Sequence, residues 1–117
     1  MLTMYTLHPI IKKDEVVSFF GERENIQLRI NRQDFETAGI LKSDPLHFHK
    51  ESTQFFIVTE GVFRVKVAGD FVDVDKNALL EITPGTTYQD YEVLSAPCTC
   101  FTIGTYNNEK DTVVVEE

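Results

Sequence analysis

The stretch HFHKESTQFF, residues 47–56, holds two of the three histidines in the chain. His47 and His49 are one residue apart, and on a β-strand such a pair points to the same face. Gln54 follows after a short polar turn, and facing side chains on adjacent antiparallel strands have Cβ atoms about 4.5–5.5 Å apart. The spacing therefore predicts that two imidazoles and one amide oxygen meet at a single point.

Two kinds of chemistry suit these side chains. Imidazole and oxygen ligands bind first-row divalent metals, so His47, His49 and Gln54 are predicted ligands of Zn, Fe, Ni or Mn. An imidazole also acts as a general base without a metal, because its ordinary pKa of about 6.5 lies near neutrality. The alternative without function is a hydrogen-bonded histidine pair beside an amide that satisfies a buried backbone group.

The elements that must position these residues are predicted to be short antiparallel strands. Residues 25–32 alternate apolar and polar side chains, which is the period of a half-buried strand. Further β-branched or aromatic runs, separated by turn signals, occupy residues 53–61, 62–75, 78–85, 88–94, 98–106 and 111–117. One short helix is expected over residues 12–21, ending at Gly21. The pattern predicts an all-β sandwich or barrel.

Length and composition limit the classes of function. The 117 residues predict one domain over residues 1–117. A net charge of −8 argues against nucleic acid, whose affinity comes from clustered cations. Neither a signal peptide nor an apolar run of about 18 residues is found, so a cytoplasmic protein without a membrane partner is expected. No organic cofactor is expected.

Several other residues have simple structural interpretations. Cys98 and Cys100 share a strand face in poor disulfide geometry, so reduced, buried side chains are expected. Arg29, Arg64 and Lys66 are expected on solvated strand faces, although one of them pointing inward would hold a substrate carboxylate or phosphate. The acidic tail, NNEKDTVVVEE, is expected to form an edge strand whose charges favour solubility.

Two stretches resemble the paired motifs of the cupins. Residues 47–61 match the first motif, with Gln54 in place of the usual glutamate. Residues 74–88 are similar to the second motif through a strand and a Pro-Gly turn, but Tyr88 stands where a histidine is usual. The resemblance implies a cupin-type double-stranded β-helix, or jelly-roll barrel, with its site inside. It also implies a homodimer, often formed through the N-terminal strands.

The departures from the cupin pattern bear on the chemistry. A glutamine amide adds no negative charge, so a metal held by His47, His49 and Gln54 would be a strong Lewis acid. Oxidised iron gains less from such a site, which favours isomerase, cyclase or lyase chemistry over that of a dioxygenase. Tyr88 is then a phenolate ligand, a proton donor or a hydrogen-bonding wall residue.

Three functions follow, in order of preference. The first is a metal-dependent enzyme in which Tyr88 assists proton transfer on a small oxygenated or carbonyl substrate. The second is a metal-free enzyme with a histidine base, because residues 47–54 also resemble the His-x-His-Lys-x-x-x-Gln stretch of nucleotide-sugar ketoisomerases. The third is a non-catalytic module that binds a small molecule inside the barrel. The predicted catalytic residues are His47, His49 and Tyr88.

Overall fold

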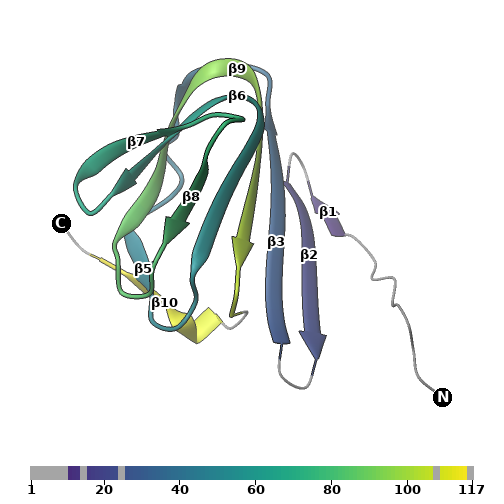
Figure 1. Cartoon of the computed structure of the whole chain (residues 1–117), viewed down its shortest axis with the longest axis vertical. Coiled ribbons are helices and arrows are strands. Elements are labelled where there is room, and N and C mark those ends of the chain that lie inside the picture. The colour runs from purple at the N-terminus through teal and green to yellow at the C-terminus, as the bar shows by residue number, and fades with distance from the viewer. Residues whose placement is uncertain (1–10, 14–15, 24–25, 107–108, 116–117) are drawn as a thin grey trace.

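A computed structural model describes residues 11–13, 16–23, 26–106 and 109–115. Antiparallel strands wrap into a barrel, and β1, β2 and β3 lie along one side of it (Figure 1). The strands are β1 (Ile11–Lys13), β2 (Val16–Arg23), β3 (Ile26–Phe35), β4 (Gly39–Ile40), β5 (His47–His49), β6 (Gln54–Val67), β7 (Asp70–Val74), β8 (Leu79–Ile82), β9 (Tyr88–Gly104) and β10 (Thr112–Val114). A single 3-10 turn, η1 (Glu109–Asp111), precedes β10 in the described part of the chain.

Two long strands, β6 and β9, run antiparallel to each other and contribute to both walls of the barrel. The first part of β6 pairs with β8 and its second part pairs with β7. The late part of β9 pairs with β3, whereas its first residue, Tyr88, pairs with His47 of β5. This all-β, double-sheet arrangement confirms the jelly roll that the sequence predicted.

Both long strands bend where their ladder is irregular, with register shifts on either side of Glu60. Gly61 adopts a φ of +80°, and a Cβ at this position would lie 2.5 Å from the backbone oxygen of Ser95. Only glycine permits such a close approach of two backbones. The glycine that ends the first cupin-like motif therefore lets one strand continue where the sequence predicted two.

The helix predicted over residues 12–21 is wrong. The strand β2 covers Val16–Arg23 and pairs with β3 along all 8 of its residues. This segment is rich in valine and phenylalanine, which favour the pleated surface of a sheet. Tertiary pairing therefore outweighs the weak helical pattern that the charged residues at its start suggested.

The apolar core fills the bend of the barrel. Along the β6–β9 ladder, Val58 lies opposite Cys100 and Phe63 lies opposite Val93. All four side chains are at most 2% exposed. The fully buried positions continue through Phe56, Val65, Val74 and Cys98. Close packing of these side chains holds the two walls together at this end.

Other predicted features are confirmed. Cys98 and Cys100 are free, buried and on one face of β9. Residues 62–75, predicted to be extended, form the second part of β6 and all of β7, which a tight turn at Ala68 and Gly69, both with positive φ, joins. The strand β10 pairs with β5 at the end of the sheet, as expected for an edge strand, while residues 116–117 lie outside the described residues.

Candidate functional site

The strand β5 places both predicted histidines between β9 and β10, at the end of the barrel away from the bend. The ring centroids of His47 and His49 lie 5.2 Å apart. The Tyr88 ring lies 4.4 Å from that of His47 and 5.6 Å from that of His49. The structure thus brings together the three residues that the sequence predicted as catalytic.

His47 has a defined tautomer. Its Nδ1 lies 2.7 Å from the carbonyl oxygen of Pro45, and a carbonyl only accepts hydrogen bonds. Nδ1 therefore carries the proton, which leaves Nε2 with a free lone pair. The residue is 8% exposed, so this basic nitrogen is held in a largely buried position.

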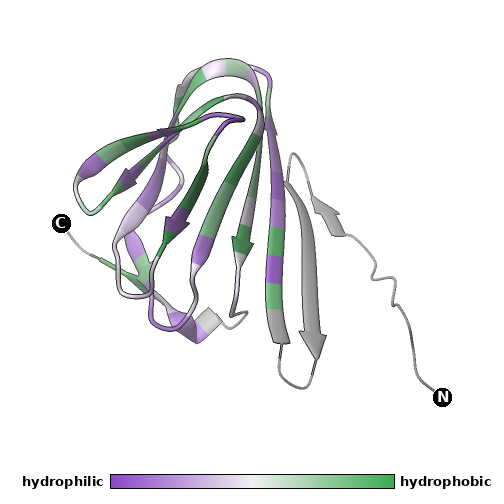
Figure 2. Ribbon diagram, in the orientation of Figure 1, coloured by the Kyte–Doolittle hydropathy of each residue, from purple (hydrophilic) through white to green (hydrophobic). Residues whose placement is uncertain are grey.

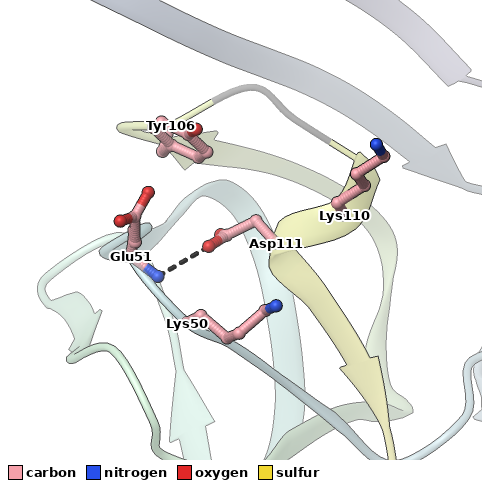
Figure 3. Close-up of a pocket in the computed structure, with 5 residues that line it drawn as sticks. All are labelled: Lys50, Glu51, Tyr106, Lys110 and Asp111. Atoms are coloured by element: carbon pink, nitrogen blue, oxygen red, sulfur yellow. Dashed lines mark hydrogen bonds between the residues drawn. The ribbon is translucent and has the colours of Figure 1, made fainter.

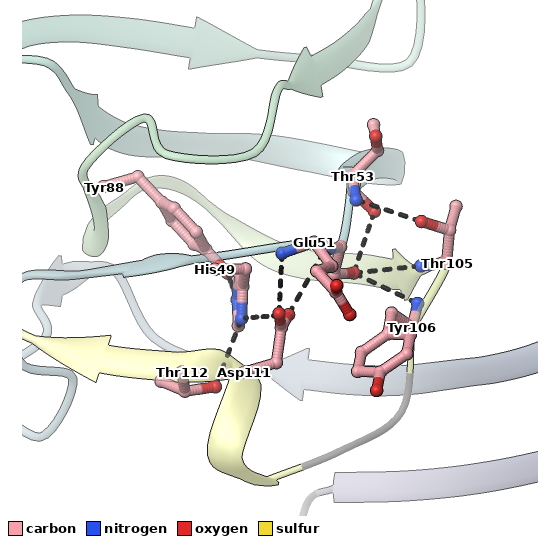
Figure 4. A network of polar contacts seen from close by, with 9 residues as sticks. His49, Glu51, Thr53, Tyr88, Thr105, Tyr106, Asp111 and Thr112 are labelled. Atoms are coloured by element: carbon pink, nitrogen blue, oxygen red, sulfur yellow. Dashed lines mark hydrogen bonds and ion pairs between the residues drawn. The ribbon is translucent and has the colours of Figure 1, made fainter.

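His49 links two polar partners (Figure 4). Its Nε2 lies 2.7 Å from the Tyr88 hydroxyl, and its Nδ1 lies 3.1 Å from the Thr112 hydroxyl. The carboxylate of Asp111 lies 3.7 Å from the same Nδ1. This negative charge favours a proton on Nδ1, so Nε2 accepts the hydrogen bond from Tyr88.

Asp111 is a member of the site that sequence reasoning missed. It was expected in a solvated acidic tail, yet it is only 4% exposed. Its carboxylate accepts hydrogen bonds from the backbone N–H groups of Glu51 and Ser52, at 2.6 and 3.1 Å. The turn that follows β5 therefore fixes this carboxylate behind His49. No local sequence pattern signals this role, because the contact joins residues far apart in the chain.

Burial controls the protonation of the site. It lowers the pKa of His49, and the nearby His47 ring and the charge of Arg29 lower it further, against the opposing charge of Asp111. Burial also raises the pKa of Tyr88 above its ordinary value, and the charges of acidic neighbours add to this. Near neutral pH the site therefore contains a neutral His49 and a protonated phenol.

Gln54 begins β6 and lies opposite Gly104. A Cβ at Gly104 would lie 3.1 Å from the Gln54 amide oxygen, so the glycine leaves room for this amide. Among the described residues, no hydrogen bond or ring contact joins the Gln54 side chain to His47 or His49. The described residues also contain no group of three His, Cys, Asp or Glu side chains arranged to hold a metal.

Most of the predicted ligand atoms are engaged by protein groups, so the site fits a metal poorly in this arrangement. Both ring nitrogens of His49 face protein partners, and Nδ1 of His47 faces a carbonyl. Only Nε2 of His47 and the Gln54 amide remain from the predicted ligand set. A metal centre at this position would require the Tyr88 hydroxyl to leave His49.

Arg29 lies on the face of β3 that borders the site, next to Gly104, although its side chain is exposed. It pairs with Gly104, and two residues later Asn31 pairs with Thr102 and donates a hydrogen bond to its hydroxyl at 3.4 Å. The alternating apolar and polar positions of β3 are visible in Figure 2. Arg64, in contrast, forms an ion pair with Asp73 on the outer face, at 2.7 Å. The polar side of β3, rather than its apolar side, therefore faces the site.

Two further carboxyl groups lie near Tyr88. Asp44 accepts a hydrogen bond from the backbone N–H of Asp90 at 2.7 Å, and its other oxygen lies 3.9 Å from Nδ1 of His47. Burial and the neighbouring Asp44 raise the pKa of Asp90 to about 8. Burial also raises the pKa of Asp44. Sequence reasoning missed both residues, since neither belongs to a recognisable motif.

A shallow surface pocket lies on the outer side of Asp111, away from the histidine rings (Figure 3). Its lining consists of Lys50, Glu51, Tyr106, Lys110 and Asp111. Asp111 thus separates this open pocket from His49. The predicted chemistry does not involve the pocket.

Solved structures share this fold. A variant of Streptomyces PAC13 with uridine matches with a TM-score of 0.67 at 16% identity, covering 98% of this chain and 93% of that chain. KdgF from Halomonas sp. matches with a TM-score of 0.62 at 12% identity, covering 88% and 92%. Oxalate decarboxylase from Bacillus subtilis matches with a TM-score of 0.66 at 16% identity, covering 92% of this chain and 30% of that chain.

These matches establish that the chain has the cupin fold. No family model and no curated protein matches the sequence. The residue arrangement must therefore supply the argument for function, because identities this low carry the fold alone. Within the described residues, no helix has the length and apolar character needed to span a membrane.

Proposed function

We propose that this protein is a cupin enzyme that moves a proton on a small oxygenated substrate, without the help of a metal. His47 is the general base, and Tyr88 donates a hydrogen bond to the reacting oxygen. His49 and Asp111 hold Tyr88 in position. The observation that carries this proposal is the chain of contacts from Tyr88 through His49 to Asp111, beside the free Nε2 of His47.

His47 is suited to remove a proton from a carbon next to a carbonyl group. Its Nδ1–H is held by Pro45, so Nε2 is the basic atom and its direction is fixed. Removal of the proton places negative charge on the substrate oxygen. In an isomerisation, the protonated His47 returns the proton to the former carbonyl carbon, while the hydroxyl proton of the first carbon passes to the enolate oxygen and the carbonyl moves by one carbon. In a dehydration, the enolate expels a hydroxyl group from the next carbon as the C=C bond forms, and His47 protonates that group so that it leaves as water.

Tyr88 is suited to stabilise the oxygen that becomes negative. Its raised pKa keeps the phenol protonated, so it acts as a hydrogen-bond donor rather than as a phenolate ligand. The Tyr88 hydroxyl lies 2.7 Å from Nε2 of His49, and its hydrogen can rotate about the C–O bond from this nitrogen to a substrate oxygen. This rotation makes the Tyr88 O–H available to the substrate while the proton on Nδ1 of His49 stays in place.

The structural neighbours support a small oxygenated substrate. PAC13 is described as a nucleoside dehydratase and was solved with uridine, and oxalate oxidase was solved with the substrate analogue glycolate. Proton transfer at a carbon beside an oxygen function belongs to both dehydration and isomerisation. We extend to this chain only the reaction class and the polar nature of the substrate.

Exchange with solvent deuterium tests the proposal. The protein is incubated in D2O and EDTA with a panel of ketoses, uronates and nucleoside aldehydes, and NMR follows exchange at the carbon next to the carbonyl. We expect exchange by the wild type, its loss in His47→Gln, and its retention in Lys66→Gln on the outer face. Exchange that persists in His47→Gln, or that requires an added metal, would overturn the proposal.

A metal-dependent enzyme is the second candidate. It is favoured by the convergence of His47 and His49, whose rings are 5.2 Å apart on one face of β5. Displacement of the Tyr88 hydroxyl would open Nε2 of His49, and Gln54 would complete the predicted set. Stoichiometric metal in the purified protein, lost from the double variant His47→Ala, His49→Ala, would establish this candidate in place of the first.

The other expectations stay predictions. A binding module would retain a ligand in the barrel without turning over any member of the carbonyl panel. Homodimer formation is tested by light scattering at several protein concentrations. A cytoplasmic location is tested by fractionation of the host cell.

A further inference from the structure

Asp90 faces the barrel interior one level deeper than Tyr88. Gln89 separates the two residues along β9. Tyr88 lies opposite Val67 of β6 and Asp90 lies opposite Val65, without a register shift between the two pairs. Val65 is fully buried. The side chains of Tyr88 and Asp90 therefore share the inner face of the strand.

The surroundings of Asp90 confirm this inward position. Its charge raises the pKa of Tyr88 on one side and of the fully buried Cys100 on the other. It therefore lies between the histidine site and the apolar bend. Part of its surface remains accessible, although protein surrounds its carboxyl group. A group in this position meets whatever enters the barrel most deeply.

The Asp90 carboxyl group has no hydrogen-bond partner among the described residues. The backbone N–H of Asp90 is satisfied by Asp44, and the nearby Gln89 amide donates to the Asp44 carbonyl at 2.9 Å. These contacts fix the backbone but leave the Asp90 side chain unused. A polar group that is removed from water without a partner destabilises the free protein, so a structural role does not explain it.

We propose that Asp90 is a substrate-recognition residue that binds a hydroxyl group on the deepest part of the ligand. This inference rests on the proposed site and names its substrate class, a neutral polyhydroxylated molecule such as a sugar or a nucleoside. A hydroxyl both donates and accepts, so it matches the carboxyl group in either protonation state. The apolar side chains beyond Asp90 then contact the carbon face of the ring.

A hydroxyl fits this position better than a cation. Burial and the charge of the neighbouring Asp44 raise the pKa of Asp90 to about 8, which leaves it largely uncharged near neutral pH. The charge of Arg29 also acts on the histidine site. An ammonium group would therefore find little uncompensated negative charge here.

The first test needs no ligand. Asp90→Asn and Asp90→Leu are compared with Asp73→Asn, which alters an exposed aspartate on the outer face. We expect both Asp90 variants to melt at least about 4 °C above the wild type at pH 8, because neither carries the buried carboxyl group whose ionisation favours the unfolded chain at that pH. The melting temperature of Asp73→Asn is expected not to rise, since this variant loses the ion pair with Arg64. A lower melting temperature for both Asp90 variants would show a structural role and overturn the proposal.

The second test measures binding in the His47→Gln background, where the proposed turnover is absent. Uridine, ribose, xylose and glucose are titrated by calorimetry, with glucosamine as the probe for a cation site. We expect at least one neutral probe to bind, and its affinity to fall at least tenfold in His47→Gln, Asp90→Leu but not in His47→Gln, Asp73→Asn. Unchanged affinity in the Asp90 variant, binding of glucosamine alone, or no binding by any probe would overturn the inference. Because this experiment measures binding and not turnover, it tests the role of Asp90 even if the proposed reaction does not occur.

Discussion

The middle of the β6–β9 ladder and its two ends turn different side chains into the barrel. At the bend the facing residues are apolar, as in the pair of Phe63 with Val93. Away from the bend, Gln54 faces Gly104, and Tyr88 lies beside the two histidines. The same pair of strands therefore builds a closed core at its bend and carries the polar residues of the site at its ends.

This difference separates stability from chemistry. The bend gains free energy from apolar burial and close packing, and the two thiols are the only reactive groups among its fully buried side chains. Burial raises the pKa of Cys98 and Cys100, which keeps these thiols unreactive. The polar end keeps groups whose burial is unfavourable, notably Asp90. Substitutions at the bend should therefore reduce stability more than activity, whereas substitutions at the polar end should reduce activity more than stability.

The largest expected effect is on turnover at the polar end. Tyr88→Phe removes the hydroxyl that faces His49 and the substrate oxygen, while the ring stays packed against Phe56. We expect the rate of solvent exchange to fall by about 100- to 10,000-fold. Tyr91→Phe is the matched control, because that ring packs against Phe71 outside the barrel. Full activity of Tyr88→Phe would mean that its hydroxyl takes no part in the reaction.

The largest expected loss of stability is at the bend. Phe63→Ala removes a side chain that is 0% exposed and contacts the rings of Phe35 and Phe56. We expect the free energy of unfolding to fall by about 3–5 kcal/mol in urea denaturation. Phe71→Ala, at a position 52% exposed, should lose far less. Equal losses would show that the bend is not the stabilising end.

An effect on stability with a defined pH dependence is expected at Asp90. Its folded pKa of about 8 lies above the unfolded value of about 3.9, so the folded state holds a proton that the unfolded state releases. The wild type therefore loses stability as the pH rises from about 4 to 8 and changes no further above that. Asp90→Asn escapes this loss.

We expect the stability gained by Asp90→Asn to grow from near zero at about pH 4 towards about 5 kcal/mol at pH 8, since a difference of one in pKa corresponds to about 1.4 kcal/mol. Urea denaturation at several pH values measures it. The charged and titratable groups around Asp90 are Asp44, Tyr88 and Cys100, and neither Tyr88 nor Cys100 titrates in this range, since both pKa values are raised. A gain that is independent of pH would contradict the assignment of the titration to this carboxyl group.

The smallest expected effect is at Thr112. Thr112→Val removes the hydroxyl 3.1 Å from Nδ1 of His49 but leaves the Asp111 charge in place. We expect a change of less than about 1 kcal/mol in stability and a loss of turnover below about tenfold. Steady-state kinetics and thermal melting measure both. A loss as large as that of Tyr88→Phe would indicate that the tautomer of His49 depends mainly on Thr112.

Local patterns predicted the fold and part of the site. The alternation of side chains along β3 and β6 and the spacing of His47 and His49 are properties of neighbouring residues. They fix which side chains share a face of a strand, because the period of a strand is two. The error over residues 12–21 arose where local propensity was weak and the pairing with β3 decided the outcome.

By itself, the sequence determined an acidic all-β chain in which His47 and His49 share one strand face and Tyr88 stands where the cupin motif has a further histidine. Tertiary structure alone decided that Asp111, 62 residues after His49 in the sequence, lies behind the His49 ring, that Asp90 turns inward and that Arg29 borders the site. The reason is physical. A tautomer or a pKa depends on charges and burial within a few ångströms, and strands distant in the chain supply these only once the barrel has closed.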